Sequence, residues 1–362
     1  MPKKVIKAVD FFCSGGGMSY GMKQAGIKVI AGIDYDADCK ATYEANNKGS
    51  KFIHADVFKL KEQDLEKQLS LKRNDDNLLL IGCSPCQFWS IIRTDKRKSE
   101  QSKDLLGEFK RFVKYFNPGF VVVENVPGIV GRKDESGLTD FVKELEEQDY
   151  KVHYEVVNMN DFGVPQSRKR FSLVASRVSS KTVFPSPSRK ANPTVRDFIG
   201  VKNGFAKVNA GHKDETKFQH IVSKLSDKNL ERLIGTPANG GNSMWWRTDK
   251  KLGREKYTGD GFKDSYSRMS WDKPAPTITT KFFSVSNGRF AHPEEHRAIS
   301  IREGATLQTF PKNYYFISNS VNGIARMIGN AVPPFLARAI AENLFSQLSI
   351  KSQKECLFTE TI

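Results

Sequence analysis

Short apolar runs alternate with amphipathic stretches over about the first 175 residues, and this alternation constrains the fold more than any other feature of the chain. The candidate strands are Ile6 to Phe12, Val29 to Ile33, Leu78 to Ile81, Phe120 to Glu124, Lys151 to Asn158 and Phe171 to Ala175. Several of them are almost entirely apolar, as expected of strands that are covered on both faces. Strands that alternate with helices in this way form βαβ units. The sequence therefore predicts an α/β fold built on a parallel sheet.

Helical periodicity is clearest between the third and fourth of these candidate strands and again near the end of the chain. Apolar residues at helical spacing are Leu105, Leu106, Phe109, Phe112, Val113 and Phe116, followed by the stop signal Asn117-Pro118-Gly119. A second set, Ile324, Met327 and Ile328, is separated by Pro333 and Pro334 from a third, Leu336, Ile340 and Leu344. We expect one helix covering the sheet and a C-terminal helical segment that residues Asn330 to Val332 begin.

The composition and periodicity of the chain change near residue 185. Pro185, Pro187 and Pro193 interrupt the pattern, and a region rich in Gly and Lys, with weak periodicity, follows. We predict a first domain over residues 1–184, a smaller loop-rich recognition domain over 185–317 and the helical segment over 318–350.

Charge and cysteine content narrow the class of protein. The chain has 57 Lys and Arg against 41 Asp and Glu, a net charge of +16 and a pI near 9.5. Such an excess suits a polyanionic partner, although a solvated basic surface would give the same composition. The cysteines are Cys13, Cys39, Cys83, Cys86 and Cys356, and the N-terminus lacks an export signal. We therefore expect a cytoplasmic protein without disulfides, membrane spans or a structural metal site.

A glycine-rich loop follows the first predicted strand. In Asp10-Phe11-Phe12-Cys13-Ser14-Gly15-Gly16-Gly17-Met18-Ser19, glycines would let a ligand approach the backbone at the carboxyl edge of the sheet. Tyr20 occupies the last glycine position of a dinucleotide motif, which disfavours a nicotinamide enzyme. Asp34 could accept hydrogen bonds from ribose hydroxyls, Tyr35 could stack on a base, and Asp56 could bind an adenine amino group. Together these residues predict a nucleoside pocket, although each alone could be a cap or a surface residue.

Three further groups are predicted to lie at the same carboxyl edge of the sheet. Cys86, in Gly82-Cys83-Ser84-Pro85-Cys86-Gln87, could be a nucleophile, the partner of Cys83 in a redox pair or an inert buried thiol. Glu124 ends the candidate strand that begins at Phe120, where burial would favour a raised pKa and a role as an acid. In Gln166-Ser167-Arg168-Lys169-Arg170, strand alternation would point Arg168 and Arg170 the same way, toward a phosphate, a carboxylate or a carbonyl oxygen.

In this order, the motifs resemble those of the cytosine-C5 DNA methyltransferases of bacterial restriction-modification systems. The resemblance rests on the glycine loop, Pro85-Cys86-Gln87, Glu124-Asn125-Val126, Gln166-x-Arg168-x-Arg170, Arg302-Glu303-Gly304-Ala305 with Leu307 to Pro311, and Gly329-Asn330-Ala331-Val332-Pro333-Pro334, and covers about residues 6 to 340. Ser14 and Ser84 depart from it, at positions where the family usually has glycine and often has proline.

The resemblance implies a Rossmann-like sheet that binds S-adenosylmethionine, a second target-recognition domain and a C-terminal segment that returns to the first domain. The cofactor-binding residues that it implies, together with the pocket residues above, are Phe12, Ser14, Gly15, Gly16, Gly17, Asp34, Tyr35, Asp56, Val57, Pro85, Asn330, Ala331 and Val332. We expect a monomer that acts on duplex DNA; pairing with a restriction endonuclease and the recognised sequence stay open.

The chemistry expected of this family assigns roles to the remaining residues. A Cys86 thiolate would add to C6 of cytosine, Glu124 would donate to N3, and Arg168 and Arg170 would hold O2. The base must leave the duplex stack, and we expect Ser90, Arg93, Lys96 and Arg97 to grip DNA from a mobile loop, although a plain surface loop has the same composition. Trp246, Arg247 and Lys281 are candidates for target reading, although the Trp245-Trp246 pair is better suited to a core than to base stacking. Transfer RNA methylation and non-enzymatic DNA binding are the alternatives.

Overall fold

The structure, a computed structural model, describes residues 5–84, 104–179, 184–187, 192–242, 246 and 264–359, with side chains described as far as residue 346. The chain divides into two compact units, which we describe separately. Unit 1 comprises residues 1–158, 169–187 and 332–362, and unit 2 comprises residues 159–168 and 188–331. The predicted boundaries at 184 and 317 differ from this division, which assigns residues 159–168 and 318–331 to unit 2. Side-chain hydrogen bonds explain the difference, because Gln166 and Arg168 donate to backbone carbonyls of other unit 2 segments.

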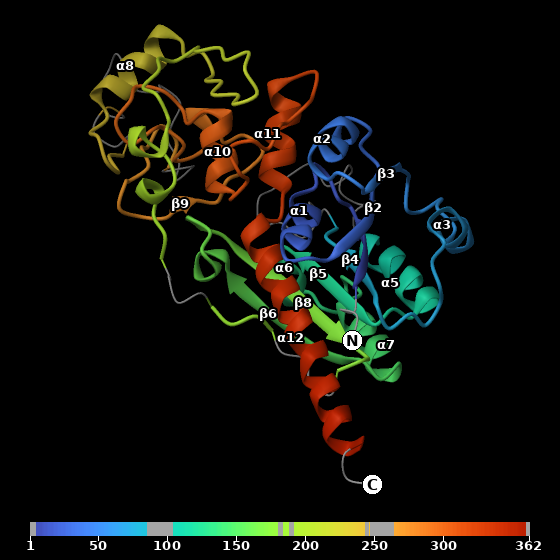
Figure 1. Cartoon of the computed structure of the whole chain (residues 1–362). Coiled ribbons are helices and arrows are strands. Elements are labelled where there is room, and N and C mark those ends of the chain that lie inside the picture. The colour runs from blue at the N-terminus through green and yellow to red at the C-terminus, as the bar shows by residue number, and fades with distance from the viewer. Residues whose placement is uncertain are drawn as a thin grey trace. The chain divides into compact units, whose positions relative to one another are not determined.

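In the described part of unit 1, seven strands form one sheet in the order β3-β2-β1-β4-β5-β8-β6 (Figure 1). The strands are β1 (Lys7–Phe11), β2 (Lys28–Asp34), β3 (Lys51–His54), β4 (Leu78–Gly82), β5 (Phe120–Asn125), β6 (Lys151–Asn158) and β8 (Lys169–Ser176). Strands β1 to β5 pair in parallel, as the alternating pattern predicted. The expectation of a parallel sheet is wrong for β8, which runs antiparallel to both β5 and β6. No unit 1 helix lies between β6 and β8 in the chain, so the two strands lack the crossover that a parallel pair requires.

Helices cover both faces of this sheet. They are α1 (Gly17–Gln24), α2 (Cys39–Asn46), α3 (Glu62–Leu69), α5 (Leu105–Phe116), α6 (Gly128–Gly131), α7 (Leu138–Glu147) and α12 (Pro334–Thr359). The predicted covering helix is confirmed as α5, whose apolar residues are all buried and pack with alternate strand residues such as Val9 and Phe11. It ends at Asn117, which adopts a left-handed conformation with φ of 42°.

Helix α12 returns to the sheet and packs along α1, as Figure 1 shows. The contact is close because Gly21 of α1 has no side chain: a Cβ atom there would lie 2.2 Å from the carbonyl oxygen of Pro334 and 2.7 Å from Ala337 Cβ. Leu336, Ile340 and Leu344 of α12 are fully or almost fully buried, as their spacing predicted.

Unit 2 is rich in loops, as expected. Its regular elements among the described residues are β7 (Gln166–Ser167), β9 (Ala275–Pro276), α8 (Asp227–Gly235), α10 (Ile301–Leu307), α11 (Val321–Asn330) and the short 3₁₀ helices η2 (Met159–Phe162), η3 (Val195–Asp197), η4 (Val201–Asn203) and η5 (Val285–Asn287). In neither unit is any described helix both long and apolar enough to span a membrane.

Candidate active site at the carboxyl edge of the sheet

The glycine loop that follows β1 turns sharply and is pinned to the end of β2. Phe12, Ser14 and Gly16 have positive φ angles of 62°, 46° and 88°. The Gly16 amide donates to the carbonyl oxygen of Cys13 at 2.8 Å, and the Ser14 amide donates to Asp34 Oδ2 at 2.8 Å. Ser14 thus adopts a conformation that favours glycine, the residue usual in the family at this position. The loop carries backbone amides to the sheet edge next to a carboxylate.

Side chains with the chemistry of a nucleoside pocket follow β2 and β3 in neighbouring positions of the sheet. Asp34 is partly buried and also accepts from the Asp36 amide at 2.8 Å, while the Tyr35 ring is 75% exposed. After β3, Asp56 accepts from the Phe58 amide at 3.1 Å, and the Val57 side chain is buried. Phe58, which the sequence analysis did not single out, leaves an aromatic ring 45% exposed beside Asp56.

Asp10 is a second feature that sequence reasoning missed. It lies fully buried in β1, and its Oδ2 accepts from the Ser19 hydroxyl at 2.6 Å. The Ser19 hydroxyl lies 3.0 Å from that of Tyr43, which lies 2.8 Å from that of Ser50, so one polar chain joins β1, α1, α2 and the start of β3. Burial raises the pKa of Asp10 to about 7, against the opposing effect of Ser19. A carboxyl group between the apolar residues Val9 and Phe11 of a strand was the signal that could have found it.

The segment that follows β4 lies next to the end of β5. The side-chain amide of Asn125 donates to the Ser84 hydroxyl at 3.2 Å. Proline, which is common in the family at this position, has no side-chain atom that could accept this hydrogen bond. Burial raises the pKa of the Cys83 thiol, and the negative charges of Asp10 and Glu124 add to this effect. A protonated Cys83 is a poor redox partner. Pro85 and Cys86 lie outside the described residues.

Glu124 and Arg170 form an ion pair at the end of β5. Arg170 Nε lies 3.4 Å from Glu124 Oε1, and the Glu124 residue is only 7% exposed. Burial lowers the pKa of Arg170, while the charge of Glu124 opposes this shift. The pair therefore combines a buried carboxyl group with a guanidinium group at the edge where the predicted nucleophile follows β4.

Arg168 does not share this environment, and the expectation that it points with Arg170 is wrong. The strand is interrupted at Arg168, which falls between β7 and β8, so strand alternation does not apply. Its guanidinium donates to the carbonyl oxygens of Ile278 at 3.0 Å, Gly329 at 3.2 Å and Ala331 at 3.3 Å, and the residue is 2% exposed. Arg168 therefore joins segments within unit 2.

The Asn330-Ala331-Val332 motif lies between two helices. Asn330 is exposed and is the last residue of α11, whereas α12 begins at Pro334. The expectation that these residues begin the helical segment is therefore wrong, because the two prolines separate α11 from α12. Ala331 and Val332 are buried, and the carbonyl oxygen of Ala331 accepts from Arg168.

Of the predicted DNA contacts, two lie within the described residues. The Trp246 ring is 3% exposed, contacts Tyr266 edge-on and lies under Arg232, so it belongs to the core of unit 2 and offers DNA no ring face. Lys281 is exposed, and its ammonium group donates to Asn322 Oδ1 at 2.9 Å. Ser90, Arg93, Lys96, Arg97 and Arg247 lie outside the described residues.

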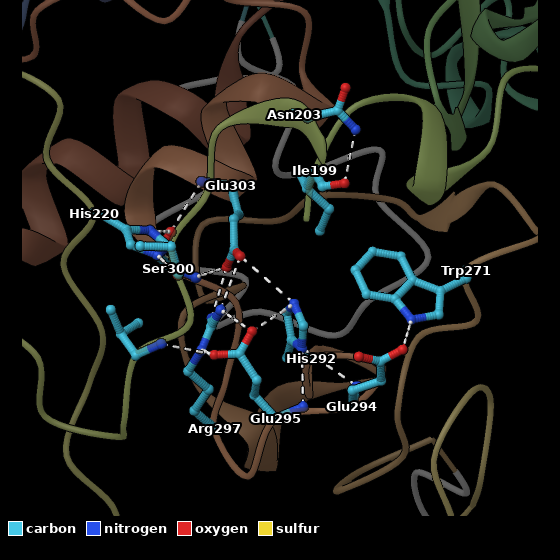
Figure 2. A network of polar contacts seen from close by, with 12 residues as sticks. Ile199, Asn203, His220, Trp271, His292, Glu294, Glu295, Arg297, Ser300 and Glu303 are labelled. Carbon is cyan, nitrogen blue, oxygen red and sulfur yellow. Dashed lines mark hydrogen bonds and ion pairs between the residues drawn. The ribbon is translucent and has the colours of Figure 1, made fainter. Parts of the chain in front are cut away.

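A buried polar network organises unit 2 around Glu303 (Figure 2). Arg297 donates to both Glu303 oxygens at 2.7 and 2.9 Å and also to Glu295. Ser300 and Glu303 form a reciprocal capping box at the start of α10, and His220 Nδ1 lies 2.8 Å from the Ser300 hydroxyl. Burial would raise the pKa of Glu303, but Arg297 outweighs it and lowers the pKa to about 2. Glu303 of the Arg302-Glu303 motif thus organises the core of unit 2.

The fold and the edge site together define a class of protein. A glycine loop after β1, acidic residues after β2 and β3 and the antiparallel β8 beside β5 belong to the Rossmann-like fold of S-adenosylmethionine-dependent methyltransferases. The fold resembles that of a solved E. coli protein assigned as a prophage-encoded DNA modification methyltransferase, with a TM-score of 0.74 over 95% of this chain and 99% of that one, at 21% identity. It also resembles S. pombe Dnmt2 methyltransferase, with a TM-score of 0.61 over 96% and 99% of the two chains, at 15% identity.

The chain belongs to the C-5 cytosine-specific DNA methylase family, whose model matches residues 6–346. Type II methylase M.HgiDII of Herpetosiphon aurantiacus is 36% identical over 340 residues, which are 93% of this chain and 94% of that protein. Type II methyltransferase M1.HphI of Haemophilus parahaemolyticus is 32% identical over 336 residues, or 92% and 85% of the two chains. The resemblance inferred from the motifs is confirmed.

Proposed function

We propose that this chain transfers a methyl group from S-adenosylmethionine to C5 of a cytosine in duplex DNA, through a covalent bond between Cys86 and C6 of the base. Family membership over residues 6–346 supports the reaction. The observation that supports the site most strongly is the buried Glu124–Arg170 pair, because it lies at the end of β5, beside the β4 strand that leads to Cys86.

The residues at the ends of β1 to β3 suit S-adenosylmethionine. The amides of the glycine loop, from Phe12 to Gly17, allow close backbone approach, and Asp34 is an acceptor for ribose hydroxyls. The exposed rings of Tyr35 and Phe58 offer faces to an adenine, with Asp56 and Val57 between them in the chain. We propose Pro85 and the Asn330-Ala331-Val332 motif as further cofactor contacts. When bound, S-adenosylmethionine supplies an electrophilic methyl group on a sulfonium centre.

The chain itself must make C5 of cytosine nucleophilic. Addition of the Cys86 thiolate to C6 places electron density on C5, and the covalent bond divides one difficult step into easier ones. Glu124 is suited to donate a proton or hydrogen bond to N3, where negative charge develops. Arg170 pairs with Glu124, and we propose that it is the arginine that meets the O2 oxygen of the base. Arg168, whose guanidinium is bonded to three unit 2 carbonyls, instead orders the polypeptide.

Incubation with tritiated S-adenosylmethionine and either duplex DNA or transfer RNA tests this function. We expect tritium in DNA, located in 5-methylcytosine after digestion to nucleosides, and none above background in RNA. Label in RNA alone would contradict the proposal, as would label in DNA on a different base. DNA that binds without becoming labelled would favour a non-enzymatic regulator.

A further inference from the structure

A closely packed segment of unit 2 holds Lys281 next to helix α11. The segment, Thr277–Phe283, follows β9. A Cβ atom on Gly329 would lie 2.4 Å from the carbonyl carbon of Thr279, and one on Gly304 would lie 2.1 Å from the Phe282 ring. Absence of both side chains thus lets α10 and α11 pack directly against the Thr277–Phe283 segment.

Hydrogen bonds of three buried side chains fix this arrangement. Arg168 donates to Ile278 in the segment and to Gly329 in α11. Gln166 accepts from the Ile278 amide at 3.1 Å and donates to the Leu307 carbonyl oxygen at 2.9 Å, while Gln308 donates to the carbonyl oxygen of Ile328 at 2.7 Å. The segment, α10 and α11 therefore form one ordered platform rather than three independent surface pieces.

The outer surface of this platform is polar and basic. On α11, Asn322 and Arg326 are exposed and lie four residues apart, on one face, while Ile324, Met327 and Ile328 are buried. Lys281 reaches that face, since its ammonium group donates to Asn322 Oδ1 at 2.9 Å. The three side chains thus define a single surface, which we call the Lys281–Arg326 face.

The charge pattern of the chain indicates what this face binds. No Asp or Glu occurs from residue 273 to 293 or from residue 304 to 341, although the whole chain has 41 of them in 362 residues. These two stretches contribute the segment and α11. An exposed lysine and arginine on a face whose two contributing stretches contain no carboxylate are complementary to a polyanion. The one carboxylate of α10, Glu303, is fully buried and paired with Arg297.

We propose that the Lys281–Arg326 face binds the phosphate backbone of duplex DNA, with Asn322 donating its amide to a phosphate oxygen while Lys281 and Arg326 neutralise charge. This inference rests on the proposed action on DNA and adds a backbone-contacting surface that orients unit 2. Such contacts fix register and orientation without reading sequence.

The test is the salt dependence of DNA binding, measured by fluorescence anisotropy with a labelled duplex of arbitrary sequence. Each neutralised phosphate contributes roughly 0.9 to the slope of log K against log salt concentration. We expect Lys281→Ala and Arg326→Ala each to lower the slope by about one and the double variant by about two, uniformly across duplex sequences. Lys281→Arg should restore the wild-type slope.

Matched controls come from exposed basic residues of unit 1. Lys143→Ala in α7 and Arg338→Ala in α12 each remove one charge from an exposed ion pair. Both should leave the slope unchanged, and all variants should keep the wild-type unfolding midpoint. An unchanged slope in the Lys281/Arg326 double variant would overturn the inference, as would a slope change seen with duplex RNA but not with DNA.

The same experiment separates this inference from the proposed function. If the wild-type protein methylates DNA but the double variant keeps the wild-type salt slope, the proposed function stands and DNA binding by the Lys281–Arg326 face is refuted. If the double variant has a lower salt slope but the wild-type protein does not methylate DNA, DNA binding by the face is supported and the proposed function is refuted.

Discussion

Asp10 couples proton binding to stability at the base of the cofactor loop. Its pKa is about 7 in the folded protein against an ordinary value of 3.8, chiefly because burial disfavours the charged form. The folded state therefore binds the proton more tightly, and the stability from Asp10 is full below pH 3.8 and is lost as the pH rises through 7. The variant Asp10→Asn lacks this pH-dependent loss. Its free energy of unfolding minus that of wild type should therefore be a few kcal/mol larger at pH 8 than at pH 4.

Urea unfolding of wild type and Asp10→Asn from pH 4 to 8 measures this effect. The unfolding free energy of wild type must be subtracted from that of the variant at each pH, because other groups act in the opposite direction. Burial lowers the pKa of His292 to about 4, so the stability that comes from the neutral ring is lost as the pH falls from 6.5 through 4. His292 is unchanged in the variant and cancels. A difference that does not vary with pH would contradict a raised pKa for Asp10.

Arg168 and Arg170 should respond differently to the same conservative substitution. In Arg168→Lys one ammonium group cannot serve the three carbonyl oxygens that the guanidinium reaches, so we expect a loss of about 1–3 kcal/mol in unfolding free energy. In Arg170→Lys a positive charge stays near Glu124, so stability should change little while kcat falls. Denaturant unfolding and steady-state kinetics on both variants check this contrast; an unstable Arg170→Lys with normal kcat would contradict it.

At the residue level, the sequence predicted which residues lie at the sheet edge better than it predicted which groups their side chains contact. Asp34, Glu124 and Arg170 could be predicted at the sheet edge because each ends or follows an apolar strand. The environment of Arg168 could not, because the partners of its guanidinium lie 110 to 163 residues further along the chain. Asp10 was missed because its hydroxyl partners come from α1, and through Ser19 from α2, which no strand pattern reveals.

Among the elements, the packing of α1 on α12 gives a direct prediction. Gly21→Ala would place a methyl group 2.2 Å from the Pro334 carbonyl oxygen, so the helices must separate, and we expect a loss of about 1–3 kcal/mol. Gly107→Ala is the matched control, because Gly107 is exposed in α5 and a new Cβ would have no described atom within 4 Å apart from its chain neighbours and the backbone of its own helix. The control should gain about 0.5–1 kcal/mol from better helix propensity. Equal effects of the two substitutions on thermal unfolding would contradict the packing.

Element type was predictable where one physical pattern dominated. Six apolar residues at helical spacing identified α5, and proline identified the break between α11 and α12. Strand direction was not predictable, because β6 and β8 have the same local pattern whether they run parallel or antiparallel. The interruption at Arg168 also left no local signal, since only its distant hydrogen bonds explain it.

For the whole molecule, order along the chain carried more information than composition. A net charge of +16 suggested a polyanion but could not distinguish DNA from RNA or from a solvated surface. Ordered motifs identified the family that the match over residues 6–346 establishes. The sequence could not show that unit 2 takes residues 159–168 from the middle of the first predicted domain, because this assignment depends on long-range hydrogen bonds.

The central claim is that Cys86 adds covalently to cytosine during methyl transfer to DNA. In duplex DNA made with 5-fluorodeoxycytidine in place of deoxycytidine, C5 carries no proton to lose after methylation, so the enzyme cannot leave the base. We predict a denaturation-resistant complex between protein and DNA that requires S-adenosylmethionine, maps to Cys86 by peptide mass spectrometry and is absent in Cys86→Ser. A Cys86→Ser protein that still forms the complex or still methylates DNA at the wild-type rate would contradict the account.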